Sequence, residues 1–400
     1  MKFTRTLLLA ALATLAVLTG CGGGGAANHI IQPPPPVSSP ISMEVVLFPG
    51  QQDGPDSAAI QQYLINNTQV ALGATLVVQW SAVDRDGIPG DYDWSYPDNQ
   101  ILPWKNAGKK VNLVIWANSD GSDPICGIPG QSGPGQFGTD GTGNCAIPTY
   151  VWKELTTTDY VTCNPGNANA SQQMPNYFNS AFQAHYKTFI QQLIQHYGSD
   201  SSIGYIRIGL GRGGETIPEG DWENTSEACG MSYVNAWGYS VSSWDSNYLQ
   251  MMLQYEGSLH SPKQLMVGVT PMGNANRNAD FAAQVAAPLG IGIGSQGWQQ
   301  SDLSNPPASC AADWCNLFTL YPTAPHELQT YGPSCPPTDS GCTGAQAATG
   351  SLVSLFPFAV ANHATIIELY LKDWLTAFDP NFPGYTGTYA TAIENAALGK

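Results

Sequence analysis

Residues 203–219, Ile-Gly-Tyr-Ile-Arg-Ile-Gly-Leu-Gly-Arg-Gly-Gly-Glu-Thr-Ile-Pro-Glu, join a short apolar strand to a glycine-rich turn and a carboxylate. The apolar side chains over 203–208 predict a buried strand. Four glycines between 209 and 214 remove side chains where this strand ends, so the backbone can turn tightly or approach a ligand. Glu215 follows them, close to Arg212. The stretch therefore predicts a carboxylate in a ligand-facing loop at the carboxyl end of a buried strand.

Further apolar stretches predict the other strands of a repeating strand–helix pattern. Helices are expected between them, most clearly over 178–197, where large apolar residues recur with helical spacing. Eight strand–helix units predict a closed (β/α)8 TIM barrel. The first and seventh strands carry the weakest pattern, and without either of them an open parallel sheet would be favoured. The predicted strands besides 203–208 are 44–48, 74–84, 111–117, 265–270, 289–294, 325–330 and 364–370.

A long insertion over 119–171 follows the third strand and is rich in Gly, Pro and Cys. Nine cysteines occur in the chain, and an even number remains beyond Cys21. In an exported chain an even number predicts disulfides, which would staple the insertion. Proximity favours Cys310–Cys315 and Cys335–Cys342. Two more bonds would then be shared by the remaining cysteines, Cys126, Cys145, Cys163 and Cys229.

The first 42 residues predict export and anchoring. Lys2 and Arg5 precede an apolar run over 7–18 that is too short for a comfortable membrane span. Leu-Thr-Gly-Cys at 18–21 resembles the bacterial lipoprotein signal box. The resemblance implies a signal peptide over 1–20, a lipid on Cys21 and, since no Asp follows it, the outer membrane. An ordinary secretory signal with an unrelated cysteine is the alternative.

The organisation that follows is a Gly/Pro-rich tether over 21–42 and one barrel domain over 43–400, expected to act as a monomer.

Net charge is -16, with 14 Lys and Arg against 30 Asp and Glu, which excludes a basic nucleic-acid footprint. An acidic chain rich in aromatic and neutral polar residues suits neutral polar ligands. No zinc, phosphate-loop or serine-hydrolase motif occurs, so neither a metal nor a cofactor is expected.

Several acids fall at the predicted carboxyl ends of strands, where the active sites of such barrels lie. Glycosidic bonds are cleaved by two carboxyl groups, one a general acid and one a nucleophile or base. Two acids on strands four and seven, such as Glu215 and Glu327, can face each other across the barrel mouth. Glu368 lies in an apolar strand and must point into the barrel mouth or pair with a cation such as Lys372, so it is the alternative nucleophile or a supporting site residue. The other acids at strand ends are Asp84, Asp86 and Asp120.

This arrangement resembles clan A of the retaining glycoside hydrolases, which carry one glutamate at the end of strand four and one at the end of strand seven. The run Asp-Tyr-Asp-Trp-Ser-Tyr at 91–96 and the segment 104–116 also look similar. The resemblance implies that Glu215 is the acid/base and Glu327 the nucleophile. One position departs from the clan, which has Asn before the strand-four acid, where it contacts the sugar 2-hydroxyl. Gly214 stands there in this sequence.

Aromatic and amide side chains near strand ends complete the expected carbohydrate site, because rings pack on sugar faces and amides bind hydroxyls. Trp80 and Tyr331 are further aromatic residues near predicted strand ends. A non-catalytic carbohydrate-binding or scaffold lipoprotein on the same barrel is the alternative function. Glu215 would then only accept backbone hydrogen bonds or pair with Arg212. The candidate substrate-binding residues are Glu368, Gln296, Trp298, Asn118, Trp116, Asp84 and Arg212.

Overall fold

A computed structural model gives the fold of most of the chain. The predicted signal peptide and Cys21 lie outside the described residues, as do Asp86, Asp120, Cys126, Cys145, Cys310 and Cys315. Within the described part, no helix has the length and apolar character that a membrane crossing requires. The described residues are 41–47, 58–67, 72–84, 88, 91–118, 146–163, 172–218, 228–270, 277–303, 316–336, 341–362 and 364–400.

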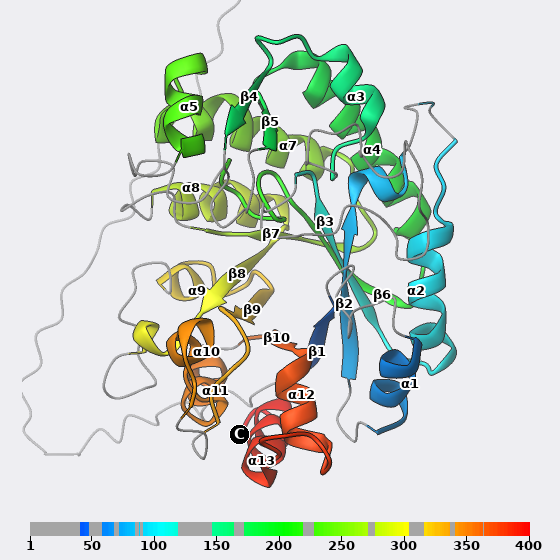
Figure 1. The fold of residues 1–400 in the computed structure, drawn as a ribbon, viewed down its shortest axis with the longest axis vertical. Coiled ribbons are helices and arrows are strands. Elements are labelled where there is room, and N and C mark those ends of the chain that lie inside the picture. The colour runs from blue at the N-terminus through cyan, green and yellow to red at the C-terminus, as the bar shows by residue number, and fades with distance from the viewer. Residues whose placement is uncertain are drawn as a thin grey trace, which may run out of the picture. The chain divides into compact units, whose positions relative to one another are not determined.

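Eight parallel strands close into a barrel, in the ring order β1-β10-β9-β8-β7-β6-β3-β2 (Figure 1). Pairing of β1 with β10, with Glu44 opposite Glu368, closes the ring and rules out the open sheet. The predicted barrel is confirmed, including its first and seventh strands. The barrel strands are β1 (Ser42–Leu47), β2 (Leu72–Gln79), β3 (Val111–Trp116), β6 (Ile203–Ile208), β7 (Gln264–Gly268), β8 (Gly292–Trp298), β9 (His326–Thr330) and β10 (Ile366–Tyr370).

Helices lie around the outside of this ring (Figure 1). They are α1 (Ala58–Asn67), η1 (Trp80–Ala82), α2 (Ser95–Asn106), α3 (Thr149–Glu154), α4 (Ser180–Tyr197), α5 (Ala228–Trp237), α6 (Val241–Trp244), η2 (Asp245–Leu249), α7 (Gln250–Ser258), α8 (Arg277–Ala286), η3 (Ala287–Leu289), η4 (Gln300–Asp302), α9 (Asn316–Leu320), α10 (Gly344–Thr349), α11 (Leu352–Ala361), α12 (Leu371–Phe378) and α13 (Gly387–Ala397).

From the sequence, Asp245 is a plausible N-cap of a helix over 245–258, but the helix begins earlier, at Val241. Ser240 caps it, because the Ser240 hydroxyl accepts from the Ser243 N–H. The Ser243 hydroxyl in turn accepts from the Ser240 N–H, which completes a capping box. Asp245 is therefore not the N-cap. It starts the π-helical turn η2 and is largely buried.

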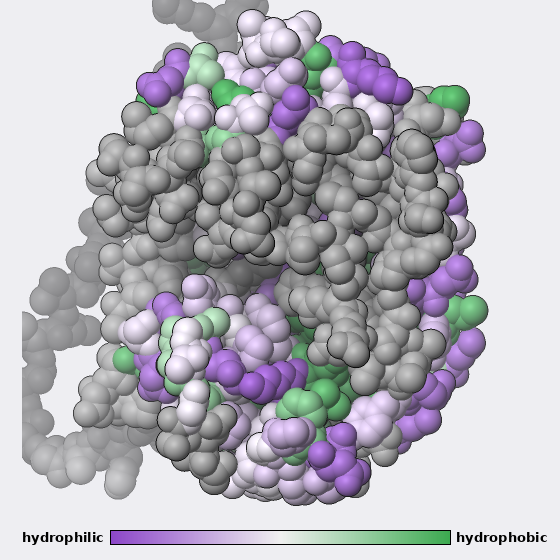
Figure 2. All heavy atoms as spheres, viewed as in Figure 1, coloured by the Kyte–Doolittle hydropathy of each residue, from purple (hydrophilic) through white to green (hydrophobic). Residues whose placement is uncertain are grey.

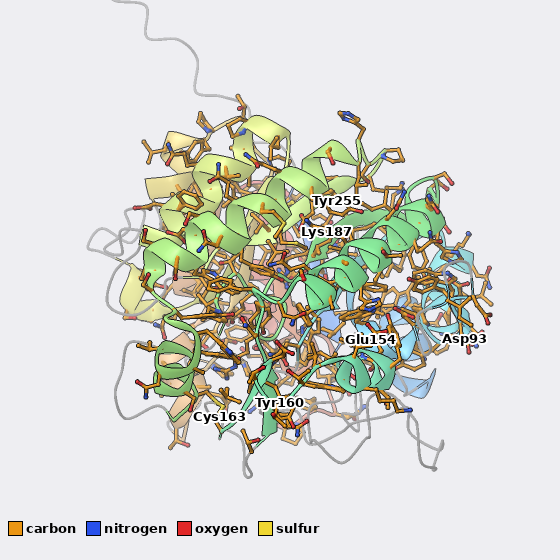
Figure 3. All side chains as sticks on the ribbon, turned by 90° about the horizontal axis from the view of Figure 1, so that it is seen from above. Asp93, Glu154, Tyr160, Cys163, Lys187 and Tyr255 are labelled. Atoms are coloured by element: carbon orange, nitrogen blue, oxygen red, sulfur yellow. A yellow bond between two sulfur atoms is a disulfide. The ribbon has the colours of Figure 1, made fainter. Side chains whose placement is uncertain are left out.

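The insertion after β3 carries structure of its own. It contains α3 and an antiparallel hairpin of β4 (Tyr160–Cys163) and β5 (Gln172–Pro175). Cys163 bonds to Cys229, which fastens the hairpin to α5, and Figure 3 shows Cys163 close to Tyr160 of the same strand. The disulfide staple is therefore present. The predicted Cys335–Cys342 bond is confirmed as well.

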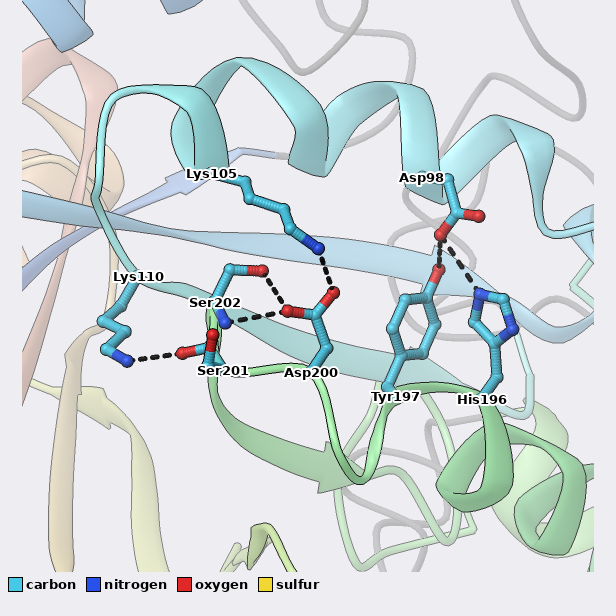
Figure 4. A network of polar contacts seen from close by, with 8 residues as sticks. All are labelled: Asp98, Lys105, Lys110, His196, Tyr197, Asp200, Ser201 and Ser202. Carbon is cyan, nitrogen blue, oxygen red and sulfur yellow. Dashed lines mark hydrogen bonds and ion pairs between the residues drawn. The ribbon is translucent and has the colours of Figure 1, made fainter.

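Side-chain contacts fix α4, the helix that leads into β6. Lys187 of α4 lies over the ring of Tyr255 in α7, 5.3 Å from its centroid (Figure 3). At the other end, Tyr197 donates to Asp98 of α2 at 2.8 Å, and Lys105 of α2 pairs with Asp200 at 2.8 Å (Figure 4). Contacts with α7 and α2 thus hold α4 and the turn that precedes β6.

On one face of the molecule, the described residues are mostly polar or near neutral (Figure 2). Figure 2 shows one face of the molecule, on which hydrophilic and near-neutral residues predominate and apolar residues occupy smaller areas. The large apolar side chains that are exposed among the described residues are scattered in sequence: Ile88, Leu102, Leu289, Leu320, Tyr331, Val353, Tyr385 and Leu398.

Candidate active site

The barrel interior is lined by polar side chains. β6 and β9 lie three strands apart around the ring, so contacts between their side chains cross the interior. Such contacts join Arg207 of β6 to Glu327 of β9. A charged network inside a closed barrel is stable only when its groups pair with one another. The buried polar residues of this network and its surroundings are Glu44, Thr75, Asn112, Arg207, Glu327, Gln329 and Glu368, with Tyr205 also buried.

Arg207 is the centre of this network. Its Nη1 lies 2.5 Å from Glu327 Oε1 and 3.2 Å from Glu368 Oε2, and its Nη2 donates to Gln329 Oε1 at 3.0 Å. All three charged side chains are at most 1% exposed. One guanidinium therefore serves two carboxyl groups away from solvent.

Glu368 is held by more donors than Arg207 alone. Thr75 Oγ1 donates to its Oε1 at 2.5 Å, and the Tyr205 hydroxyl donates to the same oxygen. Its cation is Arg207, where the sequence suggested one such as Lys372. Glu368 is fully buried, and protein groups occupy both of its oxygens. In this structure it supports Arg207 and does not face a substrate.

Glycines make room for the buried acids. A Cβ on Gly294 would lie 2.1 Å from Glu327 Oε2, and one on Gly73 would lie 2.0 Å from Glu44 Oε2. Neither distance is possible for real atoms, so any side chain at these positions would displace the carboxyl groups. The interior glycines of β2 and β8 are therefore part of the site's construction.

Burial changes the ionisation of these carboxyls. It raises the pKa of Glu327 to about 8. The nearby Arg207 charge opposes this shift, and the Glu368 charge adds to it. Burial likewise raises the pKa of Glu44 to about 8, against a hydrogen bond from Ser42 that lowers it. The network therefore holds protons at neutral pH, since one arginine does not balance three acids.

Glu215 lies in the loop that follows β6, eight residues beyond Arg207. Its backbone carbonyl accepts from the N–H groups of Leu210 and Gly211 at 3.0 and 2.8 Å, so the loop folds back on the strand end. Gly214 has φ 81°, and a Cβ there would meet Trp116 Cδ1 at 3.0 Å. This explains the departure from the clan pattern, because an Asn at 214 would be both strained and crowded.

Four of the predicted site residues gather between the ends of β3 and β6. Arg212 forms a β-bridge with Asn118, and the Gly213 N–H donates to the Asn118 carbonyl at 3.1 Å. The Asn118 side chain donates to the Tyr177 hydroxyl at 2.6 Å. Trp116 packs beside Gly214 and is only 4% exposed. The side chain of Glu215 is half-buried in the same loop system.

The other predicted contacts lie elsewhere. Asp84 accepts from Trp80 Nε1 at 2.8 Å and from the Tyr150 hydroxyl at 2.7 Å, which makes it a buried anchor of its loop. Trp298 is fully buried against Phe358, so it offers no face to a sugar in this structure. Gln296 is in register with Gln329, and its side chain is outside the described part.

Two residues, Arg207 and Tyr331, have a larger place in this region than the sequence indicated. Arg207 had a signal, since a cation inside an apolar strand must find buried partners. Tyr331 follows β9 directly and is 52% exposed, so it offers an aromatic face where Trp298 does not. In the part of the chain that the structure describes, no three or more His, Cys, Asp or Glu side chains gather as a metal site.

Comparison with known proteins gives the fold and its neighbours. No family model matches the sequence, and no curated protein matches it. The structure is similar to the β-amylase catalytic domain of Paenibacillus polymyxa, with 13% identity over 84% of this chain and 94% of that one, and a TM-score of 0.53.

Two xylanases give similar coverage. A glycoside hydrolase family 10 endo-β-1,4-xylanase from Gloeophyllum trabeum has 11% identity over 90% and 98% of the two chains, with a TM-score of 0.49. Xylanase 10B from Thermotoga petrophila has 9% identity over 89% and 94%, also with 0.49. The structural neighbours are thus glycoside hydrolases, and at these identities the likeness establishes the fold alone.

Proposed function

We propose that this protein is a glycoside hydrolase that cleaves O-glycosidic bonds of a poly- or oligosaccharide by retaining double displacement. The observation that carries the proposal is the placement of two glutamates in one closed barrel. Glu327 projects into the interior from the second residue of the seventh barrel strand, β9, and not from its carboxyl end as predicted, while Glu215 lies in the loop after the fourth, β6. The similarity of fold to a β-amylase catalytic domain is consistent with glycoside hydrolysis and says nothing of retention.

The proposed reaction uses the two glutamates in turn. Glu215 protonates the leaving glycosidic oxygen while the Glu327 carboxylate attacks the anomeric carbon, giving a glycosyl ester. Glu215 then takes a proton from water, which attacks the same carbon and releases the sugar with its original configuration. Arg207 offsets the charge of Glu327 whenever that group is ionised.

The cellular setting is a further part of this proposal. A signal peptide over 1–20, a lipid on Cys21 and a tether over 21–42 would hold a monomeric barrel domain at the outer membrane of a bacterial envelope. The support is the sequence pattern given above. Metabolic labelling with a radioactive fatty acid tests it, because a Cys21→Ser variant should lose the label.

Turnover assays test the activity itself. The purified protein is assayed on polysaccharides and aryl glycosides beside Glu215→Gln and Glu327→Gln. Each variant should lower kcat/KM by at least about a hundredfold, the usual contribution of a positioned acid or base. Glu394→Gln on the exposed side of α13 is the control and should keep full activity.

A second candidate is a non-catalytic carbohydrate-binding or scaffold protein. The complete burial of Glu327 and the Gly at 214 favour it, because the first removes the carboxyl from solvent and the second removes a sugar contact. Sugar binding without turnover in the wild type and in both variants would establish this second function.

A further inference from the structure

The two carboxyls that share Arg207 have unequal surroundings. Glu368 accepts from Thr75, Tyr205 and Arg207, so both of its oxygens have donors. Glu327 accepts from Arg207 at Oε1, and its Oε2 has no hydrogen-bond donor in the structure although it is fully buried. A carboxylate gains stability with each donor that it accepts from, whereas a buried oxygen without a donor disfavours the charge.

The positive charge of Arg207 therefore balances one of the two carboxyls more than the other. Glu368, with three donors, carries the negative charge that balances Arg207. Glu327, with one donor, is the carboxyl that holds a proton when the barrel is closed to solvent.

We propose that Glu368 and Arg207 are positioning residues of the proposed hydrolase, with Glu368 as the fixed counter-ion that controls when Glu327 becomes a carboxylate. This inference rests on the proposed function for its catalytic meaning, although the ionisation itself can be measured separately. It gives Glu368 a role that acts through Arg207 and needs no contact with substrate.

Among the described residues, titratable groups on β6, β10 and β1 interact with this pair. Arg207 and Tyr205 reach Glu327 from β6, and Glu368 faces it from β10. Glu44 of β1 interacts with Glu368 and itself keeps a raised pKa because of burial. Burial and the Glu368 charge act together in raising the pKa of Glu327 to about 8.

The decisive variant is Glu368→Gln, which removes one charge and keeps the size of the side chain. Arg207 would then be balanced by Glu327 alone, so Glu327 should ionise at lower pH. An opposite charge at this distance lowers the pKa of an acid by about 1–3 units. The acidic limb of the kcat/KM profile should therefore move down by at least about one pH unit.

Ser334→Ala is the matched control, because it also removes a buried hydrogen bond to a carboxyl, Asp373, far from Arg207 in the chain. It should lower the free energy of unfolding and leave the acidic limb in place. If Glu368→Gln does not fold, Thr75→Val and Tyr205→Phe replace it. Each removes one donor from Glu368 and should move the limb in the same direction by a smaller amount.

A second readout does not depend on activity. The protein is labelled with glutamate carrying ¹³C at the side-chain carboxyl, and the Glu327 resonance is identified by its loss in Glu327→Gln. Its titration midpoint should fall in Glu368→Gln as the kinetic limb does. An unchanged midpoint would overturn the counter-ion role, whatever the activity.

The two proposals can fail separately. A lowered midpoint in a protein that turns over no glycoside would uphold the counter-ion and reject the hydrolase. If the protein turns over glycosides and the acidic limb of its kcat/KM profile does not move in Glu368→Gln, the hydrolase is upheld and the positioning role is rejected.

Discussion

At the scale of single residues, the orientation of aromatic side chains decides which of them can meet a sugar. The register of β8 against β9 shifts between Gln296 and Trp298, and Gly297 between them has φ 99°. Such an irregularity changes the side to which the next side chain points. Trp298 consequently packs against Phe358, outside the barrel interior, and Tyr331, directly after β9, is left as an exposed aromatic at the end of that strand.

We therefore expect Tyr331→Ala to weaken substrate binding. Losing the contact between a sugar and one aromatic ring costs about 1.4 kcal/mol of binding free energy. This corresponds to a roughly tenfold increase in KM with kcat unchanged. Michaelis–Menten kinetics on the best substrate measure this split. Tyr385→Ala is the control, since Tyr385 is similarly exposed at 45% and follows α12. Equal effects of the two variants would remove Tyr331 from the site.

Gly294 gives a second prediction at this scale. Gly294→Ala should lower the free energy of unfolding by about 1–3 kcal/mol, the usual effect of overpacking, because its Cβ would collide with Glu327 Oε2. Urea unfolding measures the change. Gly387→Ala is the matched control: no atom lies within 4 Å of its added Cβ, so stability should stay the same or rise. A neutral Gly294→Ala would contradict the packing described here.

Among the secondary-structure elements, the barrel strands could be predicted from the sequence, but the buried network of Arg207, Glu327 and Glu368 could not. An apolar run predicts a buried strand from local composition, which is why all eight barrel strands were found. The pairing of Arg207 with Glu327 joins positions 120 residues apart, and only the closed ring sets that distance. The sequence therefore named Glu327 and Glu368 as candidates, but it did not predict that both would pair with Arg207.

The cap of α6 shows the same limit and gives a third prediction. Ser240→Ala should lower the free energy of unfolding by about 0.5–2 kcal/mol, because the Ser243 N–H loses its acceptor. Asp245→Asn should show no capping loss. Burial raises the pKa of Asp245 to about 7, so replacing it should help stability at pH 8. Thermal unfolding of both variants at pH 8 decides between the two caps.

At the scale of the whole molecule, buried acids should make stability depend on pH. Burial raises the pKa of Glu44 and Glu327 to about 8, and those of Asp302 and Asp373 to about 6. Between the ordinary carboxyl pKa near 4.5 and these values, the folded state binds more protons than the unfolded state. Stability must then fall as pH rises through this window.

The fourth prediction is accordingly a higher melting temperature at pH 5 than at pH 8.5. Glu44→Gln should reduce the difference, since it removes one of the groups responsible and stays neutral throughout. Differential scanning calorimetry over this range measures both. A melting temperature that rises steadily from pH 5 to 8.5 would contradict the protonated interior.

The central claim is that Glu327 attacks the sugar and Glu215 assists from the loop beyond β6. Incubation with activated 2-deoxy-2-fluoro glycosides traps the glycosyl ester of a retaining hydrolase, and peptide mass spectrometry locates it. We expect a label on Glu327 that builds up in the wild type and is absent in Glu327→Gln. A label on Glu368 or on any other carboxyl would contradict it.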